Sequence, residues 1–105
     1  MSVSTQTRNP VVYTLEQLRD MIAPLVARYG MRQASVFGSY ARGEADAESD
    51  IDVLLDGGET FRPINVFAVA EDLHEMSGKR VDVYELRELD EGPFRDTVLR
   101  EAIAL

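Results

Sequence analysis

Residues 33–55 read QASVFGSYARGEADAESDIDVLL, and this stretch decides the fold. The largely apolar run at 33–37 predicts a short strand, and 51–55 predicts a second one. Between them, 38–43 predicts a turn that leads into a brief helical piece, and the polar, acidic segment 44–49 predicts a loop. Two strands are therefore expected, joined by a glycine-bounded turn and an acidic loop.

Two acidic side chains are spaced so that they share one face of the second strand. Asp50 and Asp52 are separated by one residue, and side chains alternate along a strand. Their Cα atoms are expected about 6.5 Å apart, while Ile51, Val53 and Leu55 take the opposite face and enter the core. Like charges this close repel each other, and Mg²⁺ relieves the repulsion because it prefers carboxylate oxygens. We therefore predict that Asp50 and Asp52 are metal ligands.

A third carboxylate repeats this pattern on the next predicted strand, at 80–86. Val81 and Val83 face one way along that strand, and Asp82 faces the other. If this strand neighbours the second one, Asp82 joins the same acidic cluster. Three carboxylates from two strands then form a site for two Mg²⁺ ions about 4 Å apart.

The turn after the first strand predicts a phosphate site. Gly38 lets backbone N–H groups approach a phosphate closely, and the Ser39 hydroxyl can donate to the same oxygens. A short helix starting near Tyr40 adds a favourable dipole, and the planar guanidinium of Arg42 reaches a phosphate about one turn later. We therefore predict that Gly38, Ser39 and Arg42 hold the phosphates of a nucleotide.

Each motif alone also has a purely structural interpretation. A pair of acids on a strand is often a solvated face, and a strand followed by Gly-Ser is often only a turn. Other motifs fit worse: no P-loop pattern is present, and an EF-hand starting at Asp46 places Ile51 where a glycine is required. A phosphatase of the haloacid dehalogenase type needs an apolar strand before Asp50, where this chain is polar. The functional prediction therefore depends on the two motifs together.

A helix is predicted before this stretch. Residues 1–13 read as a loose lead-in, after which Thr14 and Gln17 form a capping-box pattern at a helix start. Apolar residues then recur at helical spacing. Pro24 predicts a kink or a helix that begins late, and Gly30 predicts its end.

After the stretch, the pattern predicts a second helix over 63–77, a third strand over 80–86 and a last helix that opens at Pro93. The apolar side chains expected to face inward from the last helix are Phe94, Val98, Leu99 and Ile103. The element order α-β-α-β-α-β-α predicts an α+β fold, in which helices flank a small mixed sheet of three strands.

Composition limits the classes of protein. The 105 residues make a single domain, 1–105, and 45% of them are hydrophobic, as in a globular chain. The absence of cysteine excludes disulfides and thiolate metal sites and fits a cytoplasmic location. We expect no secretory signal and no membrane span. The net charge of −8, with dispersed basic residues, disfavours long nucleic acids but allows a small anionic ligand that metal ions bring in.

Taken together, the motifs resemble the DNA polymerase beta-like nucleotidyltransferase superfamily, whose signature is Gly-Ser, a spacer and Asp-x-Asp. The match is closest to its minimal nucleotidyltransferase (MNT) family, in which G-S-x-A-R-G is followed by S-D-x-D, as at 38–43 and 49–52 here. The resemblance implies a nucleotidyltransferase fold and the Mg²⁺-dependent transfer of a nucleoside monophosphate from a triphosphate such as ATP to a hydroxyl. It also implies that Asp82 binds the catalytic metal and helps to deprotonate the acceptor.

The same resemblance implies a partner. In this family the nucleotidyltransferase is often an antitoxin that adenylylates a tyrosine of a HEPN RNase toxin, and the two proteins form a hetero-oligomer. Two alternatives stay open: an enzyme that acts on a small molecule or an RNA end, and an antitoxin that neutralises its partner by binding alone. The sequence does not indicate which base is preferred.

Overall fold

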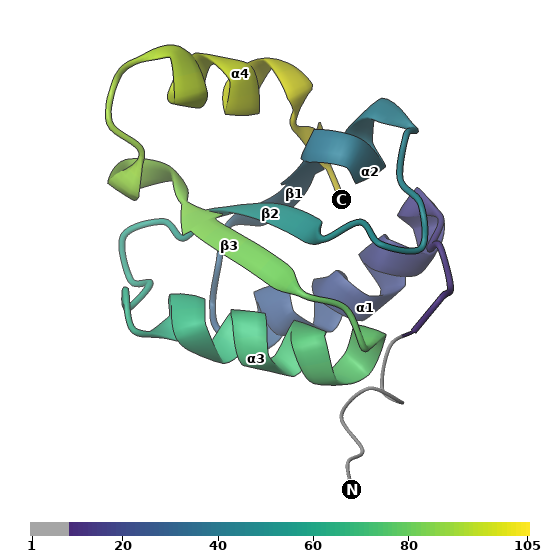
Figure 1. The fold of residues 1–105 in the computed structure, drawn as a ribbon. Coiled ribbons are helices and arrows are strands. Elements are labelled where there is room, and N and C mark those ends of the chain that lie inside the picture. The colour runs from purple at the N-terminus through teal and green to yellow at the C-terminus, as the bar shows by residue number, and fades with distance from the viewer. Residues whose placement is uncertain (1–8) are drawn as a thin grey trace, which may run out of the picture.

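The computed structural model describes residues 9–105, in which a mixed sheet of four strands has the order β3-β2-β1-β4 (Figure 1). The strands are β1 (Gln33–Phe37), β2 (Ile51–Asp56), β3 (Val81–Glu85) and β4 (Ile103–Ala104). β1 pairs antiparallel with both β2 and β4, while β2 and β3 are parallel. Residues 9–13 of the predicted lead-in form neither helix nor strand, but the side chains of Asn9 and Tyr13 both donate to the Ser77 carbonyl. Residues 1–8 lie outside the described part.

Helix α1 (Leu15–Arg28) begins where the capping pattern predicts. The Thr14 hydroxyl accepts the Gln17 N–H at 3.1 Å, and the Gln17 side-chain oxygen accepts the Thr14 N–H at 2.9 Å. The helix runs from Leu15 through Pro24, so the suggestion of a late start is wrong. The charged side chains of α1 are exposed, whereas Leu18, Ile22 and Leu25 form a buried apolar stripe along it.

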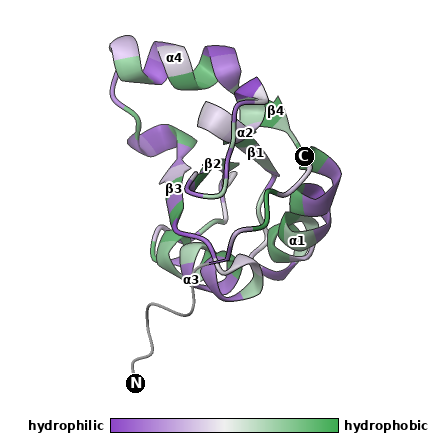
Figure 2. Ribbon diagram, turned by 45° about the vertical axis from the view of Figure 1, so that its right-hand side comes forward, coloured by the Kyte–Doolittle hydropathy of each residue, from purple (hydrophilic) through white to green (hydrophobic). Residues whose placement is uncertain are grey.

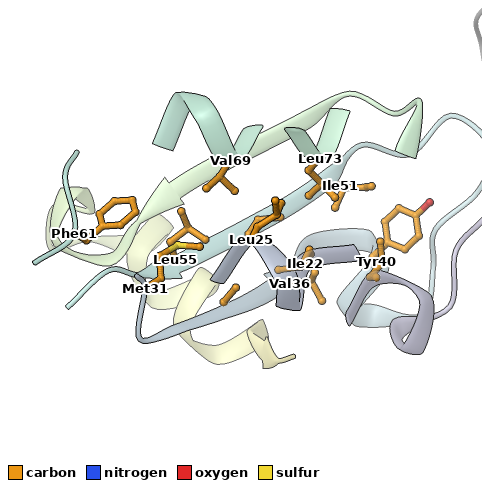
Figure 3. Packing of buried hydrophobic residues seen from close by; sticks show 13 residues of the cluster. Ile22, Leu25, Met31, Val36, Tyr40, Ile51, Leu55, Phe61, Val69 and Leu73 are labelled. Carbon is orange, nitrogen blue, oxygen red and sulfur yellow. The ribbon is translucent and has the colours of Figure 1, made fainter. Parts of the chain in front are cut away.

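The larger core lies between β1 and β2 and the helices α1 and α3 (Asn65–Ser77), which cover one face of the sheet (Figure 1). Ile51, Val53 and Leu55 of β2 are fully buried there, as the alternation predicts. Figure 3 shows Ile51 and Leu55 among residues of both helices, with Tyr40 at one end of the cluster and Phe61 at the other. Burial of this face fixes the register of β2, because a slip of one residue would bury its carboxylates.

The opposite face of the sheet carries α4 (Pro93–Glu101), with the short helix α2 (Gly38–Arg42) beside it (Figure 1). A smaller cluster of Phe37, Leu54, Leu89 and Val98 joins α4 to this face. The 3₁₀ turn η2 (Leu86–Glu88) makes the connection after β3. Figure 2 shows hydrophilic residues interrupting hydrophobic ones along α4, as expected of a helix that covers only a small patch.

The C-terminal segment differs from the sequence prediction. The α+β class is confirmed, but the sheet has four strands rather than three, because the last helix ends at Glu101 and Ile103 pairs with Val36 of β1. A strand of two residues is too short to leave a periodic pattern, and only the unpaired edge of β1 selects it. Of the side chains expected to face inward, Val98 is buried, while Phe94 and Leu99 are about half exposed.

The second helix also differs in detail. It begins at Asn65 rather than Pro63, and the apolar side chains of Ile64, Phe67 and Met76 are exposed. Within residues 9–105, no helix combines the length and apolar character needed to cross a membrane.

Candidate active site

Parallel pairing brings the predicted carboxylates together at one end of the sheet. Asp52 of β2 and Asp82 of β3 are Cα partners across the ladder, which confirms that the third strand neighbours the second. Val81 and Val83 pack against the larger core, and Asp82 is exposed on the opposite face. Asp50 lies just before β2, with its carboxylate 4.0 Å from the guanidinium of Arg80.

The glycine-serine turn lies directly against this acidic group. Phe37 is the Cα partner of Asp52, and Gly38 follows it at the start of α2. Gly38 has a φ of +72°, and a Cβ at this position would collide with the Asp52 carboxylate. Both the backbone conformation and the close approach therefore require glycine here.

The turn and the carboxylates open into one cleft with a volume of about 400 Å³. Ten residues line it: Phe37, Gly38, Ser39, Arg42, Asp50, Asp52, Phe94, Thr97, Val98 and Glu101. Five of the six predicted site residues are in this lining, and Asp82 stands beside Asp52 in the neighbouring strand. The volume lies within the range of small-ligand sites.

The electrostatics of the cleft centre on Asp52. Its partial burial, followed by the nearby carboxylates of Asp82 and Asp50, raises the pKa of Asp52 to about 6. The charge of Arg42 acts in the opposite direction but is outweighed. The negative charge of these carboxylates is therefore only partly compensated by Arg42. A divalent cation stabilises such a group of carboxylates.

The carboxylates are not gathered into a finished metal site. Over residues 9–105, no set of three acidic or histidine side chains has the geometry to hold a metal ion. Asp52 and Asp82 are opposed in register, whereas Asp50 is directed toward Arg80. The chemistry of the donors suits Mg²⁺, and their side chains would have to turn toward a bound ion.

Gly38, Ser39 and Arg42, predicted to hold phosphates, all line the cleft, and two of them already have a carboxylate partner. The Gly38 N–H donates to Glu101 Oε1 at 3.2 Å, and Arg42 Nη1 lies 3.1 Å from each oxygen of the same carboxylate. Arg42 Nε also donates to Glu44 at 2.9 Å. Arg42 is therefore already engaged through both Nε and Nη1.

Sequence reasoning missed Glu101 as a site residue. An acidic residue at the last position of a helix faces the negative end of the helix dipole, which is unfavourable without a cationic partner. That unfavourable placement was a usable signal, because Glu101 finds its partner in Arg42. Phe94 and Thr97, also in the lining, had no pattern that marked them for the cleft.

The loop before Asp50 is fixed by its own polar groups and by a buried lysine. The Ser49 hydroxyl accepts the Asp46 N–H at 2.9 Å. Lys79 is only 4% exposed and donates to the carbonyls of Ala47 and Asn9, at 3.1 and 2.5 Å. These bonds hold the approach to the acidic group in one conformation.

Comparison with known proteins gives a consistent result. The family model described as "Polymerase beta, Nucleotidyltransferase" matches residues 20–105. Protein adenylyltransferase MntA of Thermococcus cleftensis is 37% identical over 94 residues, which is 86% of this chain and 94% of that protein. A relative in Methanocaldococcus jannaschii, provisionally named a protein adenylyltransferase, is 34% identical over 85% of this chain and 95% of its own length.

Solved structures agree with the fold. A structure provisionally described as a minimal nucleotidyltransferase is 38% identical, with a TM-score of 0.73 over 89% of this chain and 97% of its own. A toxin–antitoxin complex crystallised with AMP-PNP includes a chain of the same fold, with a TM-score of 0.70 at 23% identity over 82% of this chain and 70% of its own.

Proposed function

The chain belongs to the polymerase beta nucleotidyltransferase family, and from this premise we propose that it transfers AMP from ATP to a tyrosine hydroxyl of a HEPN-type toxin. The observation that carries the proposal is the single cleft in which Ser39 faces the carboxylates of Asp50 and Asp52, with Asp82 in register beside them. A nucleotidyltransferase needs this pairing of a phosphate-binding turn with acidic metal ligands.

Asp50, Asp52 and Asp82 are the residues that would hold Mg²⁺. The fit is supported by the raised pKa of Asp52, which reports carboxylate charge that is partly buried and faces other carboxylates. Bound Mg²⁺ would supply neutralisation of charge on the phosphates and on the leaving pyrophosphate.

The turn at Gly38 and Ser39 is the proposed site for the β- and γ-phosphates. The Ser39 hydroxyl lines the cleft and can donate to a phosphate oxygen. Gly38 lets the turn lie against Asp52, so a triphosphate at Ser39 is within reach of the acidic group. Arg42, also predicted to bind these phosphates, is paired with Glu101.

The transfer step then needs a base for the acceptor. The acceptor oxygen attacks the α-phosphorus, the bond to pyrophosphate breaks, and the hydroxyl proton passes to a carboxylate. Asp82 is suited to this role because it is exposed at the edge of the cleft, where a protein side chain can approach. Asp52 lies deeper and is better placed to hold the reacting groups in position.

The acceptor is assigned from the relatives and from the charge of the chain. Relatives that are 34 and 37% identical carry protein adenylyltransferase names. The net charge of −8 suits a basic, RNA-cleaving partner better than a nucleic acid substrate. A cytoplasmic location and a hetero-oligomer with the toxin are parts of the same proposal.

Incubation of the chain with a HEPN toxin, ATP and Mg²⁺, followed by mass spectrometry of both proteins, tests the proposal. We expect a mass increase of one or more AMP groups on a toxin tyrosine, and none with Asp52→Asn. Inhibition of the toxin without any adduct would replace the proposal with neutralisation by binding. An adduct found on RNA or a small molecule instead would reassign the acceptor.

A further inference from the structure

Glu101 lines the same cleft as the acidic group and contacts the glycine-serine turn. Glu101 is the last residue of α4, and its side chain is 19% exposed. One of its oxygens accepts the Gly38 N–H, and both lie 3.1 Å from Arg42 Nη1. A single carboxylate thus contacts both the backbone of the turn and the guanidinium that ends α2.

Gly38 is consequently held from two sides. Its N–H is bonded to Glu101, and a Cβ on it would collide with the Asp52 carboxylate. The positive φ of Gly38 sets the direction in which Ser39 leaves β1. The position of the Ser39 hydroxyl therefore depends on the Glu101 contact.

The backbone that carries Glu101 is itself fastened to β1. Two residues after Glu101, β4 begins, and Ile103 pairs with Val36 of β1. The Leu105 N–H donates to the Ala34 carbonyl at 3.0 Å. β1 therefore leads directly into the turn and also pairs with the segment that follows Glu101. The hydrogen bond from the Gly38 N–H to Glu101 links the turn to that segment.

Arg42 completes this arrangement with its charge. Its guanidinium is bound by Glu101 and by Glu44, whose side chain is 66% exposed. The pair with Glu101 is the more shielded of the two, so it is expected to be the stronger. Without Arg42, the partly buried Glu101 charge would face the acidic cleft unpaired.

We propose that Glu101 and Arg42 are positioning residues that hold the Gly38–Ser39 turn in its phosphate-binding shape and stay paired when the triphosphate binds. This inference rests on the proposed function and refines it, because it assigns Arg42 to the turn rather than to a phosphate. The competing arrangement is an exchange, in which Glu101 stands in for a phosphate and releases Arg42 to the nucleotide.

The two arrangements predict opposite signs for one measurement. The binding of Mg²⁺–AMP-PNP is measured by NMR titration for wild type, Glu101→Met, Arg42→Met and the double variant. If the pair positions the turn, both single variants weaken binding by about tenfold or more, and the double variant is no worse than either one. If Arg42 moves to the phosphates, Glu101→Met binds more tightly, and that result overturns the proposal.

Two further readouts separate positioning from a general loss of stability. Glu101→Gln keeps an acceptor for the Gly38 N–H, so it should recover most of the nucleotide affinity that Glu101→Met loses. The Gly38 amide should exchange with solvent faster in Glu101→Met, and should be unchanged in the control Glu44→Met, which removes the exposed partner of Arg42 alone. An unchanged Gly38 amide exchange rate in Glu101→Met would refute the proposal that Glu101 holds the turn, even if nucleotide binding changed.

Failure of the proposed function gives a different result. If the NMR signals of the wild-type protein do not shift when Mg²⁺–AMP-PNP is added, nucleotide transfer is contradicted. The Gly38 amide exchange rate would still show whether Glu101 holds the turn.

Discussion

The ionised carboxylate of Asp52 is required by the proposed catalysis but destabilises the metal-free fold. It is half-buried, it faces Asp82 and Asp50, and its pKa is raised to about 6. A raised pKa of an acid means that the folded state disfavours the ionised form. The stabilising contribution of the neutral form is present below about pH 4, the ordinary range of an aspartic acid, and is lost as the pH rises through about 6.

Asp52→Asn should therefore abolish AMP transfer and raise the thermal stability of the metal-free protein at neutral pH. The gain should shrink as the pH falls toward about 4, where Asp52 itself becomes neutral. Thermal unfolding in EDTA over this pH range, with a transfer assay using radiolabelled ATP, measures both effects. Asp56→Asn is the control on the same strand: Asp56 forms an ion pair with the exposed Arg32 at 3.8 Å, and its Oδ1, which accepts the Gly58 N–H at 3.3 Å, is retained in asparagine. Normal labelling by Asp52→Asn would contradict the site.

A comparison of Gly38 with Gly43 distinguishes the effect of a positive φ from the effect of a steric clash with Asp52. Both have a positive φ, +72° and +74°, but a Cβ at Gly43 would meet nothing, whereas a Cβ at Gly38 would strike Asp52. Alanine at either position should destabilise the fold by about 1 kcal/mol or more. Only Gly38→Ala should also lose nucleotide binding, as measured by titration with Mg²⁺–AMP-PNP. Equal losses of binding in the two variants would show that the contact with Asp52 is unimportant.

Among the elements, the parallel pairing of β2 with β3 has the clearest functional consequence. It places Asp82 opposite Asp52, although 30 residues separate them in the sequence. The connection runs through α3, as parallel strands require a crossover. The edge position of β3 leaves Asp82 exposed, which suits a group that receives a proton from a second molecule.

Asp82→Ala should accordingly reduce transfer far more than it reduces triphosphate binding. The expected loss in the rate of transfer is about 100-fold or more, because a positioned base is removed. Single-turnover transfer and the affinity for Mg²⁺–AMP-PNP are measured side by side, with the exposed Asp90→Ala as the control. Matching losses in rate and affinity would indicate that Asp82 is structural.

Across the whole molecule, Lys79 links three segments that are distant in the sequence. Its ammonium group is buried and bonds to the carbonyls of Asn9 and Ala47, and so ties the N-terminal segment and the acidic loop to the start of β3.

Lys79→Met should lower the free energy of unfolding by about 1–3 kcal/mol, because two carbonyls lose their donor. Chemical denaturation measures this change. Arg19→Met, at a 53% exposed side chain on α1, is the control and should change stability by about 0.5 kcal/mol or less. If the two variants proved equally stable, Lys79 would not be the link between these segments.

Much of the site was determined by the sequence alone. The strand at Gln33–Phe37, the capping of α1 by Thr14 and the split of β2 into a buried and an acidic face follow from local periodicity and side-chain chemistry. The G-S-x-A-R-G and S-D-x-D motifs carried the family resemblance, because Gly38, Ser39 and Arg42, proposed for phosphate, lie in one short stretch with Asp50 and Asp52, proposed for Mg²⁺.

Only the tertiary structure decided which elements meet. The pairing of Asp52 with Asp82, the fourth strand at Ile103–Ala104 and the contact of Glu101 with the turn each join residues at least 30 positions apart, or depend on an open sheet edge. Local sequence patterns report how a residue faces its own helix or strand. They carry no information about which distant group will lie opposite it, because that is set by the packing of the whole chain.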